Sequence, residues 1–129
     1  MHQERLQALR LRYPAVYGNT LRTECGDGWF GILDALGEQL VRQAELEHRV
    51  ATEIRMFKEK FGTLRLGKTA QTIADAAYCE MAITMSFRIC EVCGCPGDHF
   101  GTIVRCGTHD QILDARAYEG AQYTERTTQ

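Results

Sequence analysis

The feature that most constrains this 129-residue chain is a set of four metal-ligand residues in its C-terminal third. Cys90 and Cys93 form a C-x2-C pair, and Cys106 and His109 form a C-x2-H pair after twelve intervening residues. Zinc prefers four tetrahedral ligands drawn from thiolate and imidazole groups. A two-residue gap lets both members of a pair reach one ion from a tight turn. The spacing therefore predicts a zinc site with these four residues as ligands.

The residues around these ligands predict a treble-clef-like finger. Gly94 follows the second thiolate, where a knuckle often needs a positive φ, and the β-branched segment 102–105 is typical of a return strand. A helix is then expected to begin at Thr108 or His109 and to carry the last ligands. Its apolar positions would be Ile112, Leu113 and Tyr118.

Two other interpretations of the cysteines compete with a structural zinc. Four buried free thiols would be the simplest, but ligand-type residues rarely fall at this spacing by chance. A catalytic zinc would need an open coordination position and a carboxylate base, for which Glu91 and Asp98 are the nearest candidates. Three cysteines and one histidine fill all four positions, so we expect the zinc to be structural. Cys95 and His99 remain possible alternative ligands, and Cys25 and Cys79 have no assigned role.

Composition predicts one small soluble domain. Hydrophobic residues make up 44% of the chain and charged residues 25%, with a formal net charge of −2, which is ordinary for a globular protein. We expect a single domain over 1–129, with a helix and hairpin body at 1–89, the finger at 90–119 and a flexible tail at 120–129. No apolar run is long enough for a transmembrane helix. Metal-type cysteines without a signal peptide predict a cytoplasmic location.

Helical periodicity predicts a short first helix and two longer ones. A helix over 2–13 should end at Pro14, and a second over 29–48 should have Asp27 as its N-cap. The apolar stripe of the second helix, expected to face the core, comprises Trp29, Leu33, Leu36, Leu40 and Ala44.

The third predicted helix covers 72–89, where Thr72 and Asp75 have the spacing of a capping box. We expect its apolar stripe to form a core face, and the alternative is an adaptable methionine-containing groove. The stripe comprises Ile73, Ala77, Met81, Thr84 and Met85.

A basic β-hairpin is predicted between the two long helices. Residues 50–57 alternate with period two, with Ile54 and Met56 on one face, and residues 63–66 form the partner strand after a connection at 58–62. The hairpin could be a contact surface for phosphates or an acidic protein, or simply a solvated sheet face. Its basic residues are Arg55, Lys58, Lys60, Arg65 and Lys68. The predicted fold class is therefore α+β: two main helices, a β-hairpin and a C-terminal treble-clef-like zinc finger.

Catalytic motifs are missing from the sequence. Neither the P-loop pattern nor the dinucleotide-binding glycine pattern is present. Ser86 is the only serine, and no cysteine outside the proposed metal site has a recognisable nucleophile context. The sequence therefore predicts a protein that is not an enzyme.

Three further motifs occur in a characteristic order. They are CGDGW at 25–29, KEKFGTLR at 58–65 and ICEVCG at 89–94, followed by a Pro-Gly pair and the Cys106/His109 pair. Together they resemble a group of small zinc-finger proteins encoded by bacteriophages and prophages, over about residues 24–110. The resemblance implies a phage origin, the cytoplasm of an infected bacterium and the zinc assignment. The additional Cys95 departs from the pattern, and no catalytic residues carry over.

These observations lead to two hypotheses about function. The first is a binding protein that occupies a bacterial host protein and inhibits a defence or regulatory component. The second is a nucleic-acid-binding regulator that uses the basic hairpin and the finger, although the finger itself has few basic residues. A homodimer is compatible with the methionine stripe, and no membrane partner is expected.

Overall fold

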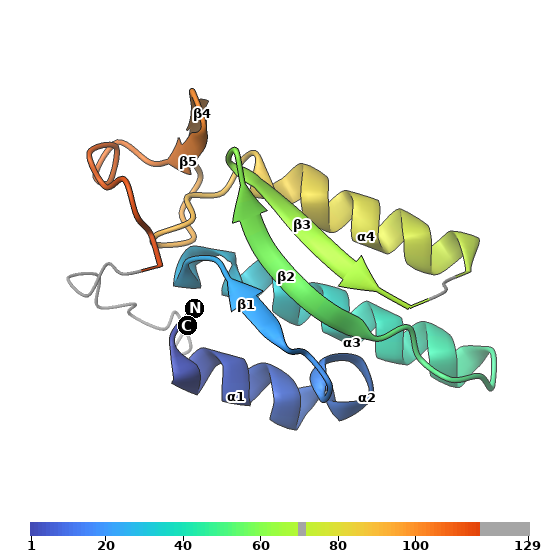
Figure 1. The fold of residues 1–129 in the computed structure, drawn as a ribbon. Helices are drawn as coiled ribbons and strands as arrows, with labels where there is room; N and C mark the ends of the chain where they lie inside the picture. The colour runs from blue at the N-terminus through green and yellow to red at the C-terminus, as the bar shows by residue number, and fades with distance from the viewer. Residues whose placement is uncertain (70–71, 117–129) are drawn as a thin grey trace, which may run out of the picture.

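The structure is a computed structural model that describes residues 1–69 and 72–116. Helices, a small sheet and a C-terminal finger make an α+β fold, which confirms the predicted class (Figure 1). The elements are α1 (Gln3–Arg12), α2 (Pro14–Tyr17), β1 (Arg22–Glu24), the 3₁₀ turn η1 (Asp27–Trp29), α3 (Phe30–Leu46), β2 (Ile54–Lys60), β3 (Thr63–Lys68), α4 (Ile73–Ser86), β4 (Asp98–Phe100) and β5 (Ile103–Arg105).

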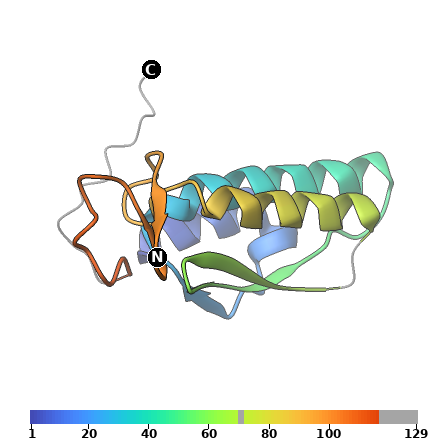
Figure 2. The ribbon, with the colours of Figure 1, turned by 90° about the horizontal axis from the view of Figure 1, so that it is seen from above.

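A three-stranded sheet in the order β1-β2-β3 forms the centre of the body. β1 runs parallel to β2, and β2 is antiparallel to β3. Figure 2 shows the helices stacked on one side of this sheet, and within the described residues no helix covers the other side. Phe57 and Leu64 point into the core on the helix side and are fully buried. The sheet therefore has one covered face and one open face.

The predicted hairpin is present, but its first strand lies further along the chain than expected and its second strand is longer. β2 continues to Lys60, so the turn contains only Phe61 and Gly62, with φ angles of 55° and 80°. Two successive residues with positive φ are typical of a type I′ turn, whose twist matches that of the flanking strands. Residues 50–53 precede the strand, contrary to the prediction.

The predicted alternation of faces in this strand was also wrong. The register shifts between Ile54 and Met56, and an extra residue of this kind moves the following side chains to the opposite face. As a result Ile54 and Phe57 are both fully buried, whereas Val50 is 88% exposed. Only the pairing of the strands reveals this bulge.

The apolar stripe of α3 packs as predicted. Every residue of the stripe is buried against the sheet or the neighbouring helices. The N-cap prediction was wrong, because Asp27 lies in the preceding 3₁₀ turn and accepts a hydrogen bond of 2.8 Å from the His2 backbone N–H. Trp29 precedes the helix without a side-chain cap.

The start of α4 is as predicted, but its buried face is not. The Asp75 backbone N–H donates to Thr72 Oγ1 over 3.2 Å, which is the expected cap. The predicted stripe faces solvent, since Ile73 is 92% exposed and Met81 is 61% exposed. The buried residues of the helix are Asp75, Cys79, Ala82 and Ser86.

Polar contacts account for this orientation of α4. The Asp75 carboxylate accepts hydrogen bonds from Arg49 Nη1 at 2.9 Å and from Thr52 Oγ1 at 2.7 Å. At the other end of the helix, Ser86 Oγ accepts from the Leu64 backbone N–H of β3 at 3.0 Å. A buried polar group is stable only when it is hydrogen-bonded. These partners therefore hold the polar face of α4 against the sheet.

In the finger, the predicted return strand is present but the predicted helix is not. β4 and β5 pair as an antiparallel hairpin, whereas the described residues after Cys106 form turns up to residue 116. The buried Arg105 explains the turns. Its guanidinium donates hydrogen bonds to the carbonyls of Ile112 at 2.7 Å and Leu113 at 3.1 Å, so these carbonyls are not free to accept the hydrogen bonds of a helix. Tyr118 and the tail at 120–129 lie outside the described residues.

No helix in the described ranges is both long and apolar enough to cross a membrane.

Candidate metal centre

The four predicted ligands converge on one point. Their ligand atoms all lie within 4.8 Å of one another. The Sγ atoms of Cys93 and Cys106 are 3.7 Å apart, and His109 Nδ1 lies 3.3 Å from Cys106 Sγ and 4.0 Å from Cys90 Sγ. Bond lengths of about 2.3 Å to sulfur and 2.0 Å to nitrogen give tetrahedral edges of about 3.5–3.8 Å. The cluster therefore has the size and donor set of a tetrahedral metal site with His109 bound through Nδ1.

The surroundings of the thiols favour one thiolate at Cys106. Burial by itself raises the pKa of this thiol, but hydrogen bonds from the backbone N–H groups of His109 and Thr108 outweigh it and lower the pKa to about 7. Burial raises the pKa of Cys93 to about 12. The pKa of Cys106 therefore lies below that of Cys93. A bound cation would offset the repulsion between the three thiolates.

Cys95 and His99 are not part of the ligand set. The metal cluster contains neither residue. The Cys95 carbonyl accepts a hydrogen bond of 2.8 Å from the Cys90 N–H, which shapes the knuckle. His99 Nε2 lies 3.2 Å from the carbonyl oxygen of Phe61 at the hairpin tip, and its ring packs 5.6 Å from that of Phe87. His99 therefore joins the finger to the hairpin.

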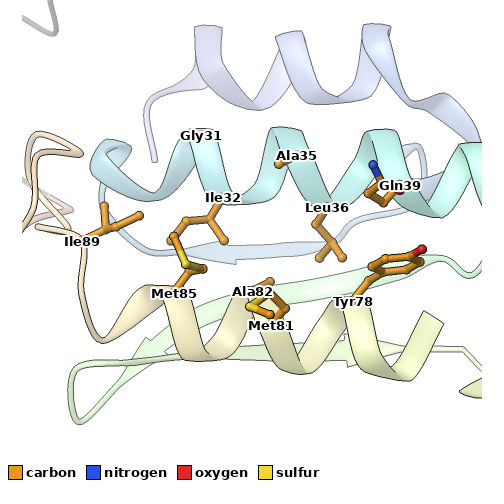
Figure 3. Close-up of a pocket in the computed structure, with 10 residues that line it drawn as sticks. All are labelled: Gly31, Ile32, Ala35, Leu36, Gln39, Tyr78, Met81, Ala82, Met85 and Ile89. Atoms are coloured by element: carbon orange, nitrogen blue, oxygen red, sulfur yellow. The ribbon is translucent and has the colours of Figure 1, made fainter. Parts of the chain in front are cut away.

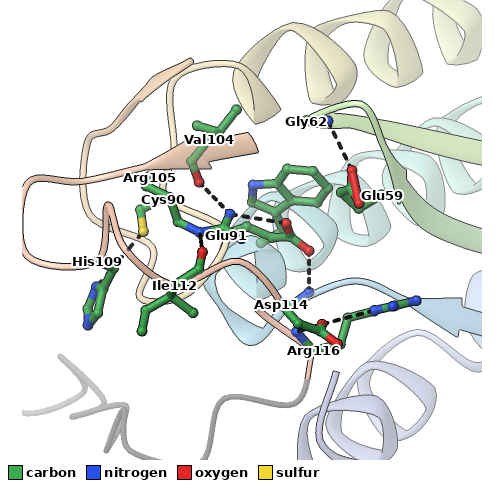
Figure 4. A network of polar contacts seen from close by, with 12 residues as sticks. Glu59, Gly62, Cys90, Glu91, Val104, Arg105, His109, Ile112, Asp114 and Arg116 are labelled. Atoms are coloured by element: carbon green, nitrogen blue, oxygen red, sulfur yellow. Dashed lines mark hydrogen bonds and ion pairs between the residues drawn. The ribbon is translucent and has the colours of Figure 1, made fainter. Parts of the chain in front are cut away.

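The knuckle docks against the CGDGW segment, far away in the sequence. The Gly28 N–H donates to the Glu91 carbonyl over 2.8 Å, the Gly26 N–H donates to the Glu91 carboxylate over 2.8 Å, and Trp29 Nε1 donates to the Ile89 carbonyl over 3.0 Å. Figure 4 shows this contact, with Glu91 between the knuckle and the body. Two of the motifs in the sequence therefore form one interface.

The two glycines of this segment allow the close approach. A Cβ atom at Gly28 would lie 2.1 Å from the Cys90 carbonyl oxygen, and one at Gly26 would lie 2.4 Å from the Glu91 carbonyl oxygen. The sequence indicated only a turn at these positions. The glycines on either side of Asp27 could nevertheless have predicted the contact, because glycine also occurs where another backbone segment comes close.

A buried ion pair lies behind the metal ligands. The side chains of Glu91 and Arg105 are 4% and 1% exposed, with Arg105 Nη1 3.4 Å from Glu91 Oε1. Burial raises the pKa of Glu91, while the Gly26 N–H and the charge of Arg105 act in the opposite direction. Since both groups are paired, this network holds the finger loop in place (Figure 4). Sequence reasoning gave neither residue a structural role.

The basic hairpin residues do not all gather on one surface. Lys58 and Arg65 lie directly opposite each other on the open face of the sheet. Arg55 instead pairs with Glu53 at 3.3 Å, and Lys68 pairs in register with the buried Ile54. Lys60 extends toward the tip, where its Nζ lies 5.8 Å from the Phe61 ring centroid. The open face thus contains part of the predicted set.

An apolar groove runs between α3 and α4, on the opposite side of the molecule from the open sheet face. Its volume is about 240 Å³, and Figure 3 shows its side chains approaching one another from the two helices. Met81 and Met85, which line it, are 61% and 39% exposed. The other lining residues are Gly31, Ile32, Ala35, Leu36, Gln39, Tyr78, Ala82 and Ile89. This is the groove that the sequence offered as the alternative interpretation of the methionine stripe.

Comparisons of the chain with family models, curated proteins and solved structures find no match.

Proposed function

We propose that this chain is a small, zinc-stabilised binding protein that acts through contact with another protein. The observation that supports this best is the groove between α3 and α4. Apolar side chains line it, and two of them are methionines with substantial exposed surface. Exposed apolar patches often mark interaction sites, and flexible methionine side chains adapt to the shape of a partner.

Zinc is the ion proposed for the metal centre. Three thiolates and one imidazole at tetrahedral spacing are the donors that this ion prefers. The four protein ligands leave no coordination position for a substrate, so the proposed role is structural. The ion would hold the knuckle against the CGDGW segment and thereby stabilise the finger on the body.

The proposed partner is a bacterial host protein. The motifs at 25–29, 58–65 and 89–94 resemble those of phage-encoded proteins, which supports a phage origin and action in the bacterial cytoplasm. A small protein without a proposed catalytic site can act by occupying its target. We therefore propose inhibition of a host-defence or regulatory component.

Affinity capture tests this proposal. Tagged protein would be incubated with bacterial lysate, with and without nuclease, and with Met81→Glu and Ile73→Glu as matched variants. Both positions are exposed apolar residues of α4, but only Met81 lines the groove. We expect one stoichiometric, nuclease-resistant protein that Met81→Glu loses and Ile73→Glu retains. No captured protein, or equal capture by both variants, would contradict the proposal.

The open sheet face favours nucleic-acid binding as a second candidate. Lys58 and Arg65 lie directly opposite each other across β2 and β3, and Glu24 of β1 lies in register with Lys58 on its other side. Like charges directly opposite repel, and Glu24 offsets part of this repulsion. A bound phosphate backbone would relieve that repulsion. The test is binding to duplex and single-stranded DNA at increasing salt, because phosphate contacts give a steep salt dependence. Absent or salt-independent binding would exclude this candidate.

A further inference from the structure

The tip of the β2–β3 hairpin carries an aromatic side chain in an unfavourable backbone conformation. Phe61 has a φ angle of 55°, which bulky residues rarely adopt, and glycine, asparagine or aspartate normally takes this position of a type I′ turn. Its side chain is 63% exposed and belongs to neither of the two hydrophobic clusters of the described residues. The fold therefore gains little from this ring. Strained residues of this kind cluster at functional sites.

Contacts from the strand and from the finger hold the turn in this conformation. The Gly62 N–H donates to Glu59 Oε2 over 3.0 Å. From the finger, His99 Nε2 lies 3.2 Å from the Phe61 carbonyl oxygen, and a Cβ atom at Gly62 would lie 2.7 Å from the same nitrogen. Figure 1 shows the tip beside β4 and β5. A turn held in place on two sides thus presents the Phe61 ring to solvent.

Cations extend from this tip across the open face of the sheet. Side chains of a strand alternate between its two faces, and Phe57 and Leu64 are buried on the helix side. Their neighbours Lys58 and Arg65 therefore lie on the open face, in register with each other, and Lys60 lies on the same face one pair nearer the turn. No helix of the described residues covers this face (Figure 2).

The carboxylates near these cations do not cancel their charge. Glu24 is on the open face, but its Oε1 forms an ion pair of 3.0 Å with Arg22 of the same strand. Glu59 lies on the covered face, where it accepts the hydrogen bond from the turn. At the bulge, Arg55 pairs with Glu53. After these pairs are set aside, the open face keeps the three positive charges nearer the tip.

We propose that the hairpin tip and the open sheet face bind single-stranded nucleic acid, with one base stacked on Phe61 and the backbone phosphates on Lys58, Lys60 and Arg65. This inference rests on the second candidate function and specifies its ligand. Lys60 Nζ lies 5.8 Å from the Phe61 ring centroid, so a cation adjoins the ring as a phosphate adjoins its base. Aromatic rings beside a basic surface are typical of proteins that bind single strands. In a duplex the bases are stacked inside and out of reach of the ring.

Fluorescence anisotropy with labelled oligonucleotides tests the proposal. The probes are oligothymidylate, oligouridylate and an abasic strand, each of about 12 nucleotides, and a duplex of mixed sequence. We expect both pyrimidine strands to bind at least fivefold more tightly than the abasic strand, which is the lower end of the range for one stacked base. The tighter of the two pyrimidine strands identifies DNA or RNA as the natural ligand. Equal binding of the abasic and pyrimidine strands would overturn the stacking.

Substitutions at Phe61 separate binding from stability. Asparagine adopts a positive φ more easily than phenylalanine, so Phe61→Asn should be at least as stable as the wild type in urea unfolding. It should nevertheless bind oligothymidylate at least fivefold more weakly, with unchanged binding of the abasic strand and the duplex. Phe61→Trp should keep the affinity for oligothymidylate, because tryptophan also offers an aromatic face.

Phe100→Ala is the matched control for the loss of an exposed ring. Phe100 is 48% exposed. Together with Asp98 it alternates with His99 along β4, so both side chains point away from the contact between His99 and the tip. The variant should bind oligothymidylate as the wild type does. A loss equal to that of Phe61→Asn would overturn the assignment of the site to the tip.

Charge is tested by the salt dependence of binding. Lys58→Gln and Arg65→Gln should each reduce the slope of log affinity against log salt concentration by about 0.7, the value for one phosphate contact of a single strand. Arg42→Gln, which removes a cation of an exposed ion pair with Glu38 on α3, should leave the slope unchanged. Equal slopes for all three variants would exclude the open sheet face as the phosphate site.

The outcomes distinguish failure of this inference from failure of the proposed functions. If oligothymidylate binds with a steep salt dependence but Phe61→Asn binds it as the wild type does, the stacking inference is wrong and nucleic-acid binding by the open face stands. If no oligonucleotide binds, the inference and the second candidate function both fail. A nuclease-resistant host protein that Phe61→Asn loses and Met81→Glu retains would show that the tip binds protein, which would overturn both the inference and the proposed role of the groove.

Discussion

Gly26 and Gly28 show how individual residues determine whether the finger can dock. Each lies where a side chain would overlap a backbone oxygen of the knuckle. Backbone atoms cannot move aside as the end of a flexible side chain can. These two positions therefore couple the CGDGW segment to the metal site.

Replacing Gly28 with alanine is expected to destabilise the protein. The added Cβ would lie 2.1 Å from the Cys90 carbonyl oxygen, and overpacking of this kind costs about 1–3 kcal/mol. Urea unfolding measures the loss. Gly31→Ala is the matched control, because its Cβ has no neighbour within 4 Å, and it should leave stability unchanged or slightly higher. Equal stability of the two variants would contradict the docking role of Gly28.

Metal affinity should depend on pH through the ligand thiols. The pKa of Cys106 is lowered to about 7, so its thiolate is available above pH 7 and becomes protonated below it. Because protons compete with the metal for the thiolate, affinity for Zn²⁺ should fall at least about tenfold per pH unit below pH 7. Competition with a chromophoric chelator between pH 8 and pH 6 measures this dependence. Cys79→Ser should give the same slope, and a pH-independent affinity would exclude thiolate ligation.

At the scale of the elements, α4 is held to the body by polar groups at both ends. Asp75 contacts Arg49 and Thr52, and Ser86 contacts β3. The result is that the two methionines of this helix face outward and form one wall of the groove. Structural contacts on one face of the helix thus create the candidate binding surface on another.

Truncating Asp75 should therefore lower the free energy of unfolding more than removing the helix cap does. Asp75→Ala removes the buried acceptor shared by Arg49 Nη1 and Thr52 Oγ1, although Arg49 keeps its ion pair with Glu47. Leaving buried donors without their acceptor costs about 1–3 kcal/mol. Thr72→Ala removes the cap and the 3.3 Å hydrogen bond from Arg49 Nη2 to Thr72 Oγ1, and it should cost about 1 kcal/mol because Arg49 keeps its two carboxylate partners. Thermal unfolding of both variants ranks the two effects. A larger loss for Thr72→Ala would show that the buried pair does not hold the helix.

At the scale of the whole molecule, the metal site and the body share one interface. The finger contacts the body at the CGDGW segment and at the hairpin tip, where His99 meets Phe61. The groove begins at the same end, since Ile89 lines it and its carbonyl accepts a hydrogen bond from Trp29. Loss of the metal should therefore change the structure both at the interface between finger and body and at the finger end of the groove.

Removing the metal should change the environment of Trp29. This residue is the only tryptophan and is fully buried, and its Nε1 donates to the Ile89 carbonyl immediately before the first ligand. Treatment with a chelator is expected to release the knuckle and to shift tryptophan emission to longer wavelength. Added Zn²⁺ should restore it. Unchanged emission after complete metal removal would mean that the finger docks without its ion.

Local patterns were sufficient for several features. Ligand spacing predicted which four residues converge, the 3.6-residue period predicted the buried stripe of α3, and Thr72 marked the start of α4. Each of these depends on residues within a few turns of one another, where chain geometry limits the possibilities. The hairpin was recognised for the same reason, although its bulge was not.

Tertiary contacts decided the rest. Hydrophobicity alone placed the methionines of α4 inside, but Asp75 and Ser86 require buried partners from β3 and from the loop before β2, and these partners set the orientation of the helix. Likewise Arg105 donates hydrogen bonds to the carbonyls of Ile112 and Leu113, which in the predicted helix would have accepted hydrogen bonds from backbone N–H groups. A buried polar group must find its hydrogen bonds wherever the fold supplies them. The sequence by itself determined the metal ligands and the period of α3, while only the folded chain determined which surfaces were left exposed.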